Sequence, residues 1–231
     1  MTAQGQTAIA TAPSFAACTV AGVELHLLAE RAAWLPSSRT LLVADLHIGK
    51  AAAFRSHGVP VPGGTTLDAL ERLSLLVRRH GAERIVFLGD FLHSARGRLP
   101  ATLAHVLAWR EAHAALVLTL VEGNHDRHAG PPPDALRIEM VREPLVEGPL
   151  RLCHHPVADA GGYVIAGHLH PAFVLRARAN ERLRLPCYWF GPRVGVLPAF
   201  GGFTGMAQVE PEAGDRIWVI ADDRVLALPV R

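Results

Sequence analysis

Residues 40–47 read Thr-Leu-Leu-Val-Ala-Asp-Leu-His, an apolar run that ends in an acidic residue and a histidine. The run from Thr40 to Ala44 has the composition of a short buried strand, so Asp45 and His47 are expected to project from its carboxyl end. Two residues apart, both side chains can be aimed at one metal ion by a tight turn. Alone, this motif does not distinguish a metal site from a surface Asp beside a core His, because short motifs need their context.

An apolar run followed by potential metal ligands recurs further along the chain. The later examples are Ile85–Leu88 before Gly89-Asp90, Ala114–Val121 before Gly123-Asn124-His125-Asp126, Leu150–Cys153 before His154-His155, and Val164–Ala166 before Gly167-His168-Leu169-His170. Carboxylate, imidazole and amide oxygen are ligands for hard and borderline divalent ions. Each motif by itself is compatible with a turn or a helix cap, but the whole ordered series predicts a two-metal hydrolase site. Two divalent ions held roughly 3.5–4 Å apart are suited to attack on phosphate esters.

The residue types predict different roles within this site. The two carboxylate oxygens of Asp90 can bridge two ions, and Asn124 can ligate an ion without adding charge. His125 is expected beside the ions, where it can give a proton to a leaving oxygen. Asp126 is expected to hold the other ring nitrogen of His125. His93 lies close to Asp90 in the sequence and remains a further candidate.

The second half of the chain supplies the remaining histidines. His168 and His170 are separated by one residue, a common spacing for a pair of metal ligands. The pair His154-His155 is ambiguous, and we choose His154 as the ligand because it directly follows an apolar run. His155 is then expected to contact substrate or to pack. Lys50, the single lysine of the chain, lies in its first half, three residues beyond His47, so it could touch a substrate phosphate.

The order of expected elements indicates an α/β fold. The first half alternates strands with helices, which we expect at residues 49–57, from a Thr65/Thr66 cap through Val77, and at residues 100–113. The second half contains mainly short strands, which we expect at Ile138–Val141, Leu150–Cys153, Tyr163–Ala166, Phe173–Arg176, Leu183–Phe190, Ile217–Ile220 and Val225–Leu228. Residues 1–14 look like a loose tail, and residues 15–231 a single domain with two packed sheets and helices outside.

Composition excludes several other classes. The chain has 231 residues, 50% of them hydrophobic, and a net charge of +2, which permits an anionic substrate without requiring one. Three cysteines form no dense framework, and no signal sequence or membrane-length apolar stretch is present, so we expect a cytoplasmic protein without a membrane segment. The sequence has no Cys-x-x-Cys pair, no P-loop and no Gly-x-Ser-x-Gly motif.

The series Asp-x-His, Gly-Asp, Gly-Asn-His-Asp, His and Gly-His-x-His resembles the calcineurin-like metallophosphoesterase superfamily. The resemblance implies a four-layer αββα sandwich of two mixed sheets flanked by helices, with His125 as the catalytic histidine. It also implies two ligand sets, Asp45, His47, Asp90 and His170 for one ion, and Asp90, Asn124, His154 and His168 for the other. Lys50 and Arg55 would then steer the phosphate backbone of the substrate.

A narrower resemblance rests on residues 45–55, Gly58–Gly64 and Leu197–Gly205, which are similar to the ligase-associated DNA-damage-response endonucleases. These bacterial metallophosphoesterases are encoded beside a DNA ligase, a helicase and an exonuclease, so the resemblance implies phosphodiester hydrolysis of DNA in repair with these partners. We expect Mn²⁺ as the metal, with Zn²⁺, Fe²⁺ or Mg²⁺ as alternatives.

Other functions remain open on the same residues. A phosphatase or a small-molecule phosphodiesterase, for example one for cyclic nucleotides, would use the same ligands, whereas a non-catalytic scaffold is disfavoured because every ligand position is filled. The residues favour DNA only weakly, since the sequence has no long basic run and no aromatic series for stacking bases. Trp189 fits either the core of a strand or the rim of a site.

Overall fold

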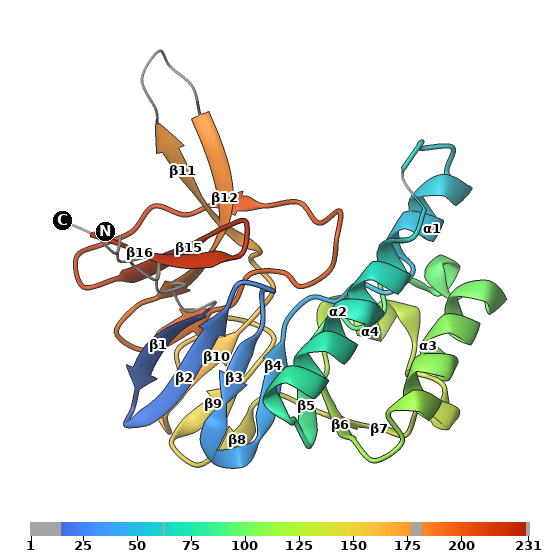
Figure 1. Ribbon diagram of the computed structural model, residues 1–231, viewed down its shortest axis with the longest axis horizontal. Coiled ribbons are helices and arrows are strands. Elements are labelled where there is room, and N and C mark those ends of the chain that lie inside the picture. Colours follow the sequence, from blue (N-terminus) through green and yellow to red (C-terminus); the bar gives the residue numbers. More distant parts are fainter. Residues whose placement is uncertain (1–14, 62, 177–181, 230–231) are drawn as a thin grey trace, which may run out of the picture.

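Two β-sheets pack face to face in the computed structural model (Figure 1), which describes residues 15–61, 63–176 and 182–229. The proposed tail at residues 1–14 lies outside the described residues, as does Pro62 in the loop that follows the first helix. The division into a tail and one domain therefore stays a prediction.

Among the described residues, seven strands form the first sheet in the order in which they follow one another in the sequence. They are β1 (Phe15–Val20), β2 (Val23–Leu28), β3 (Ala33–Leu35), β4 (Thr40–Val43), β5 (Arg84–Leu88), β6 (Val117–Val121) and β7 (Ile138–Val141). Strands β1 to β4 run antiparallel, whereas β4 to β7 are parallel. The sequence did not predict β3, which has three residues and is too short for an alternating pattern.

The second sheet is also mixed, with nine strands among the described residues. They are β8 (Leu145–Glu147), β9 (Leu150–Leu152), β10 (Tyr163–Ala166), β11 (Pro171–Arg176), β12 (Arg182–Phe190), β13 (Val194–Val196), β14 (Ala207–Gln208), β15 (Arg216–Ala221) and β16 (Arg224–Leu228). Strand β10 runs parallel to β9 and β13, whereas β12 runs antiparallel to β11, β13 and β15. The unpredicted strands β8, β13 and β14 are two or three residues long.

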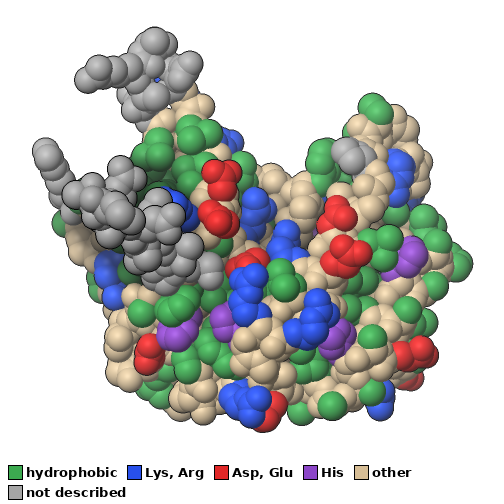
Figure 2. All heavy atoms as spheres, in the orientation of Figure 1, with side chains coloured by type: hydrophobic (Ala, Val, Ile, Leu, Met, Phe, Trp, Pro, Cys, Tyr) green, Lys and Arg blue, Asp and Glu red, His purple; other side chains and the backbone are tan. Residues whose placement is uncertain are grey.

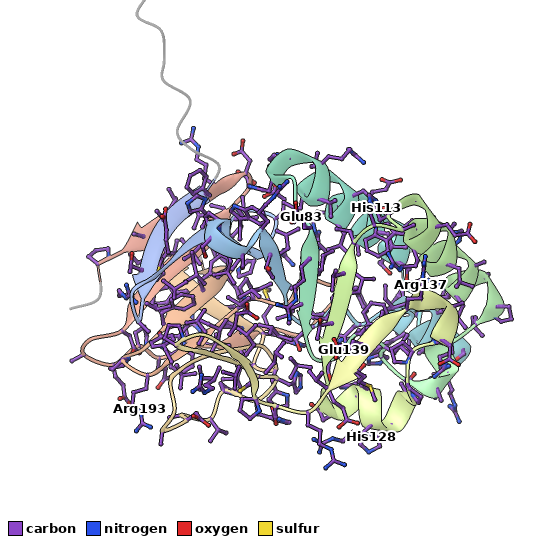
Figure 3. The ribbon with its side chains drawn as sticks, turned by 90° about the horizontal axis from the view of Figure 1, so that it is seen from below. Glu83, His113, His128, Arg137, Glu139 and Arg193 are labelled. Atoms are coloured by element: carbon purple, nitrogen blue, oxygen red, sulfur yellow. The ribbon has the colours of Figure 1, made fainter. Side chains whose placement is uncertain are left out.

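The helices lie together on the outer face of the first sheet, which Figures 1 and 3 show from two directions. They are α1 (Lys50–Ser56), α2 (Thr65–His80), α3 (Pro100–Ala112) and α4 (Asn124–Ala129). Two mixed sheets with flanking helices confirm the predicted fold class. The described part of the chain has no helix after β7, so the outer helical layer that the four-layer sandwich implies for the second sheet has no counterpart there. No described helix is long and apolar enough to cross a membrane.

Alternation along the central strands builds two separate layers of core. Leu41 and Val43 of β4 pack towards the helices, together with Leu73 of α2. Leu42 and Ala44 point the other way and pack against residues of the second sheet. Because side chains alternate between the faces of a strand, one short run such as residues 40–44 contributes to both layers. Because β4 packs on both faces, the position of its carboxyl end and the direction in which the chain leaves it are fixed.

Helix α2 begins differently from the sequence prediction. Its first residue is Thr65, and the preceding Gly64 has a φ of 88°, with no side-chain hydrogen bond at the cap. The predicted Thr65/Thr66 cap is therefore wrong, because a left-handed glycine turns the chain into the helix instead. Leu70 and Leu73 are buried, whereas Leu67, one turn before Leu70, is 40% exposed.

Candidate metal centre

The predicted ligands follow strands that end at one edge of each sheet. Strands β4, β5 and β6 are parallel neighbours, so the residues that follow them, including Asp45, Asp90 and Asn124, emerge side by side. Strands β9 and β10 are likewise parallel, and lead into His154 and His168. Carboxyl ends of parallel strands are a common position for binding sites because the loops there converge.

Most of the predicted ligands have a left-handed backbone. The φ angles are 53° at Asp45, 50° at His47, 53° at Asp90, 72° at His168 and 50° at His170. Left-handed residues other than glycine are uncommon, although Asp and His tolerate the conformation better than most types. Such outliers concentrate at functional sites, where the surrounding structure holds them. The sharp turns aim successive side chains into the same space.

Two glycines give these side chains room. A Cβ on Gly89 would lie 2.1 Å from Nδ1 of His154, and Gly89 has a φ of 79°. A Cβ on Gly123 would lie 2.4 Å from both the backbone nitrogen and Oδ1 of Asp90. The sequence motifs Gly-Asp and Gly-Asn-His-Asp therefore need their glycines because ligand side chains pack directly against the backbone.

The ligand atoms gather into two groups that share Asp90. In the first group, Nε2 of His47 lies 3.3 Å from Nε2 of His170 and 3.8 Å from Oδ2 of Asp90. In the second group, Nε2 of His154 lies 2.8 Å from Oδ1 of Asn124 and 3.5 Å from Oδ1 of Asp90. The two oxygens of Asp90 thus face different groups, which is the arrangement expected of a bridging carboxylate.

Two further predicted ligands complete the groups. Oδ1 of Asp45 lies 3.6 Å from Nε2 of His170, in the first group. Nδ1 of His168 lies 3.0 Å from Nε2 of His154, in the second. The structure therefore brings together all seven predicted ligands, while their role in binding metal stays a prediction.

Backbone groups fix which nitrogen of each ring faces the centre. Nδ1 of His154 donates to the carbonyl of Leu88 at 3.0 Å, and Nδ1 of His170 donates to the carbonyl of Gly205 at 2.9 Å. In the neutral tautomer that these bonds favour, the Nε2 atom of each ring carries no proton and points into the cluster. Hydrogen bonds of this kind orient histidine ligands in metal sites and set their tautomer.

The donor atoms fit divalent metal ions. Oδ1 of Asp45 is fully buried and has no hydrogen-bond partner, and a buried carboxylate oxygen is costly unless a cation or donor pairs with it. Neighbouring donors near 3 Å match adjacent ligands of one ion with bonds of about 2.0–2.2 Å. The residues that could hold ions are carboxylates and imidazoles, with no thiolate in the groups found among the described residues. This donor set suits Mn²⁺, Fe²⁺ or Zn²⁺.

The protonation of two of the rings, His47 and His168, also suits ligation. Burial and the nearby Lys50 ammonium hold the pKa of His47 far below its ordinary value. Burial lowers the pKa of His168 as well, with the neighbouring His154 adding to the effect. Imidazole binds metal in its neutral form, so these two rings need no deprotonation near neutral pH.

His125 stands at the open side of the centre. Its Nε2 lies 4.0 Å from Oδ2 of Asp90, and its side chain is 38% exposed. Its Nδ1 donates to the backbone carbonyl of His93 at 2.8 Å, which leaves Nε2 directed at the space beside Asp90. The ring of His93 stacks on that of His125 with centroids 4.9 Å apart, so this candidate belongs to the site as a neighbour of His125.

The predicted role of Asp126 is wrong. Its carboxylate accepts from the backbone nitrogens of Gly123 at 3.0 Å and of Leu92 at 3.1 Å, and it does not contact the ring of His125. The backbone carbonyl of His93 takes the orienting role instead. Asp126 stabilises the first turn of α4, where a carboxylate at the third helical position can bond back to the start of the helix.

The three predicted substrate contacts, Lys50, Arg55 and His155, lie in different environments. Lys50 begins α1 and is half-buried. Burial lowers the pKa of its ammonium, whereas the charges of Asp45 and Asp90 raise it. Arg55 is exposed on α1, where it donates to the carbonyl of Val61 at 3.5 Å. His155 directs Nδ1 to Oε1 of Glu143 at 2.7 Å.

Sequence reasoning missed Glu143. Its carboxylate accepts from the backbone nitrogens of His154 at 2.9 Å and His155 at 3.0 Å, in addition to the ring of His155. These bonds support the choice of His154 as the ligand, since they turn His155 towards Glu143 and leave His154 facing Asp90. No motif marks Glu143, which belongs to a turn between two strands.

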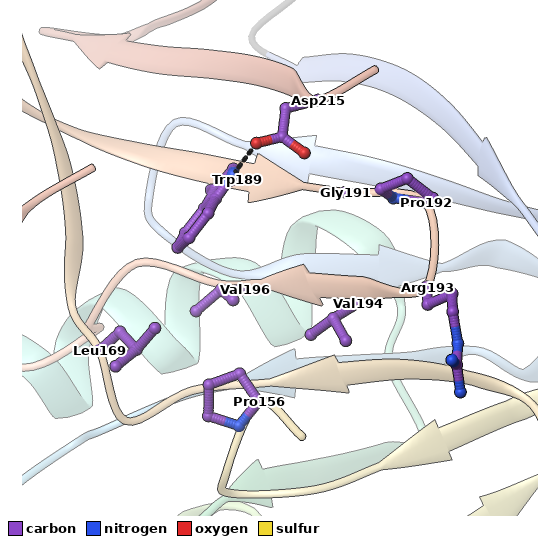
Figure 4. A pocket seen from close by; sticks show the side chains of 9 residues that line it. All are labelled: Pro156, Leu169, Trp189, Gly191, Pro192, Arg193, Val194, Val196 and Asp215. Carbon is purple, nitrogen blue, oxygen red and sulfur yellow. Dashed lines mark hydrogen bonds between the residues drawn. The ribbon is translucent and has the colours of Figure 1, made fainter. Parts of the chain in front are cut away.

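A cavity of about 290 Å³ lies on the outer face of the second sheet (Figure 4). It is bordered by Leu169, between two predicted ligands, and by Pro156, which follows His155. Trp189 lines it from β12, half-buried, with Nε1 donating to Oδ2 of Asp215 at 2.7 Å. Trp189 also packs against the small core cluster that contains Cys187 and Ile217, so the structure places it on a strand, between that cluster and the cavity.

A comparison with solved structures finds a strong match to this chain. The crystal structure of the Pseudomonas putida nuclease MPE is 44% identical, covers 93% of this chain and 100% of that one, and superposes with a TM-score of 0.82. Two other matches superpose poorly. The Escherichia coli phosphoesterase Yfce is 16% identical, covers 79% of this chain and 88% of its own, and has a TM-score of 0.38. The Aquifex aeolicus protein AQ665, of unknown function, is 16% identical, covers 57% of this chain and 78% of its own, and has a TM-score of 0.39. No protein-family model and no curated protein matches the chain.

Proposed function

This chain belongs to the calcineurin-like metallophosphoesterases, and from that premise we propose that it is a DNA endonuclease with two divalent metal ions. At the coarser level, it is a metal-dependent hydrolase of phosphodiester bonds. The proposal adds the nucleic acid, the residues that hold the ions, and the residue that assists the leaving group.

The observation that carries the proposal is the position of Asp90 between two groups of ligand atoms. One ion would be held by Asp45, His47, Asp90 and His170, and the other by Asp90, Asn124, His154 and His168. Each group combines oxygen and imidazole nitrogen at separations of 2.8–3.8 Å. When bound, two divalent ions supply Lewis acidity, which offsets negative charge on a phosphodiester and eases the ionisation of water.

His125 then acts as the proton donor. Because Nδ1 is held by the carbonyl of His93, the free position for a proton or an oxygen is Nε2, on the side of Asp90. The leaving group of a phosphodiester departs as an alkoxide, and its oxygen needs either a proton or a hydrogen bond as its bond to phosphorus breaks. The partial exposure of this ring allows it to exchange protons with water between turnovers.

Lys50 supplies a fixed positive charge to the same space. It is half-buried at the start of α1, close enough to Asp45 and Asp90 for their charges to act on its pKa. An ammonium there can bind a non-bridging phosphate oxygen and raise the local concentration of an anionic substrate. Arg55 and His155 are proposed as outer contacts to the same backbone.

Similarity to a protein described as a nuclease supports DNA as the substrate. Figure 2 shows the surface hollowed between the β11–β12 hairpin and the end of the molecule that carries α1, a shape that suits an extended strand. We further propose a role in DNA repair with a DNA ligase, a helicase and an exonuclease, Mn²⁺ as the metal, and the cytoplasm as the location. Three buried free cysteines are compatible with a reducing compartment.

The test compares Mn²⁺-dependent hydrolysis of three substrates: bis-p-nitrophenyl phosphate, p-nitrophenyl phosphate and circular single-stranded DNA. The endonuclease predicts cutting of the diester and the circle, with little action on the monoester. His125→Ala should abolish turnover, whereas His105→Ala, an exposed histidine on α3, should not. Asp90→Asn should also abolish it, and near-wild-type rates in that variant would contradict the ligand assignment.

Each alternative has its own outcome. Cutting of the monoester alone would make the protein a phosphatase, and cutting of the small diester without the circle would make it a small-molecule phosphodiesterase. A protein that binds Mn²⁺ but cuts none of the three would be a scaffold. Exonuclease activity would appear as degradation of linear strands while the circle stays intact.

A further inference from the structure

Two phenylalanines outside the predicted ligand set extend a row of rings away from His125. Phe54 of α1 stacks on His93 with ring centroids 6.0 Å apart and planes 26° apart. His93 stacks in turn on His125, at 4.9 Å and 24°. Phe203 meets Phe54 edge to face, with centroids 5.9 Å apart. We call Phe54 and Phe203 the aromatic rim, since they continue the ring of the proposed proton donor to the surface.

Phe203 is unusual in two respects. Its side chain is 51% exposed, so the ring gains little from burial. Its φ is 59°, in the left-handed region that a bulky residue rarely adopts. Asp and His tolerate this conformation in the neighbouring ligands, but a phenylalanine has no polar atom with which to compensate. A strained backbone that carries a half-exposed ring does not help the fold, and outliers of this kind are typical of ligand contacts.

The loop that carries Phe203 is tied to the metal centre on both sides. Before Phe203, the backbone nitrogen of Gly201 donates to the carbonyl of Asp45 at 3.1 Å. After it, the carbonyl of Gly205 accepts from Nδ1 of His170 at 2.9 Å. Because both anchors are predicted ligands, the position of the ring is fixed relative to the phosphate that the centre would hold.

We propose that Phe203, backed by Phe54, stacks on a nucleobase next to the phosphodiester that is cut. The inference rests on the proposed nuclease activity. A rigid, exposed, uncharged ring offers its face to another planar ring, and the base attached to a bound phosphodiester is the planar group that a strand brings closest. Lys50 and the metal centre would bind the negatively charged phosphate, whereas the aromatic rim would stack on the base.

This contact does not select a sequence. Every base has a π-face, so base–aromatic stacking tolerates all of them, and each stacked base typically contributes a factor of about five to 150 in binding. The rim therefore explains how a chain with no long basic run can hold single-stranded DNA. The aromatic rim could not be predicted from the sequence, because Phe54 and Phe203 lie far apart along the chain.

The test uses single strands of about a dozen nucleotides in which one central phosphodiester is the only hydrolysable linkage and all others are methylphosphonates. Three strands are compared: one with all bases, one abasic on the 5′ side of the cleavable bond, and one abasic on the 3′ side. For the wild type, kcat/KM should fall about five- to 150-fold for one of the two abasic strands.

Variants assign that loss to the ring. Phe203→Ala should cut the complete strand and that abasic strand equally, whereas Phe203→Trp should keep the difference. Phe203→Gly removes the ring and also relieves the left-handed backbone, so its melting temperature should match or exceed the wild type while the base dependence is lost. Leu226→Ala truncates an exposed residue on β16 and should change neither property.

The outcomes separate the two proposals. Equal cutting of all three strands by the wild type, or an unchanged base dependence in Phe203→Ala and Phe203→Gly, would overturn the aromatic rim and leave the nuclease assignment intact. Hydrolysis of bis-p-nitrophenyl phosphate without cutting of any strand would overturn the nuclease assignment and the rim with it.

Discussion

Replacing Gly89 with alanine tests whether the glycines of the metal motifs exist to make room for ligands. A methyl group on Gly89 would lie 2.1 Å from Nδ1 and 2.4 Å from Cγ of His154. His154 is fully buried, and its ring is held by the carbonyl of Leu88 and by Asn124. The ring cannot turn aside without breaking those hydrogen bonds, so the clash must displace a predicted ligand.

The cost has three parts. A left-handed alanine costs about 1–2 kcal/mol, because the φ of Gly89 is 79°. Overpacking of a tightly packed site costs about 1–3 kcal/mol, and loss of the hydrogen bond from His154 to Leu88 about 0.5–1.5 kcal/mol. The free energy of unfolding should therefore fall by roughly 2.5–6.5 kcal/mol relative to the wild type.

Gly22→Ala is the matched control. Gly22 has a φ of 77°, almost the same as Gly89, but a Cβ there would have nothing within 4 Å. This variant should lose only the backbone part, about 1–2 kcal/mol, and should keep full activity. Comparing the two variants by urea unfolding without added metal isolates the clash with His154.

The functional assay is Mn²⁺-dependent hydrolysis of bis-p-nitrophenyl phosphate. Gly89→Ala should lose most of its activity even at temperatures where it remains folded, because His154 no longer faces Asn124 and His168. If Gly89→Ala matched Gly22→Ala in both unfolding free energy and hydrolysis, the close packing of glycine and ligand would have no bearing on the site, and the reasoning would be refuted.

Three further predictions concern residues around the centre. Glu143→Gln should lower the unfolding free energy by about 1–3 kcal/mol and reduce turnover, because it weakens charge-assisted hydrogen bonds from His154 and His155. The control is Glu139→Gln, at an exposed position on β7 (Figure 3), which should change neither quantity. Urea unfolding and hydrolysis assays measure both. Arg72→Ala should raise KM more than it lowers kcat. The guanidinium of Arg72 lies 4.0 Å over the ring of Phe200 and also donates to the carbonyl of Phe200, so it holds the loop that carries Phe203. An equal loss in kcat in steady-state kinetics would contradict this. Cys187 is fully buried, and burial raises the pKa of its thiol to about 12. Iodoacetamide should therefore label Cys187 only as fast as the protein unfolds. If mass spectrometry detected rapid labelling of the native protein, the fold would open in a way that the structure does not predict.

Local sequence predicted which residues gather at the centre, because each of them depends on a short segment, while their role as ligands stays a prediction. The run from Thr40 to Ala44 is buried on both faces of one sheet, and this is what makes it apolar throughout and makes its end at Asp45 visible. Gly89-Asp90 and His168-x-His170 follow buried strands in the same way. Parallel pairing of those strands then brings the motifs together without further information.

Long-range contacts could not be predicted from the sequence. Glu143 meets His154 and His155 because it lies in the connection between β7 of the first sheet and β8 of the second, and a single acidic residue in such a turn has no distinctive pattern. The error at Asp126 has the opposite cause. A carboxylate next to a histidine suggested an ion pair, but the first turn of a helix offered it backbone donors that lie closer.

The left-handed residues connect the chemistry of the site to its backbone. Asp45 and Asp90 are tied to the rest of the centre by backbone bonds, from His47 to the carbonyl of Asp90 at 2.8 Å and from Gly201 to the carbonyl of Asp45 at 3.1 Å. Asp and His are residue types that bind divalent metals and also tolerate a positive φ, so a turn that needs both properties selects them. Phe203 has neither property, yet it adopts the same conformation in a loop held by the same residues. The bonds that hold the centre therefore also hold this ring, and the proposed contact with a nucleobase is a gain that can offset the strain of its backbone.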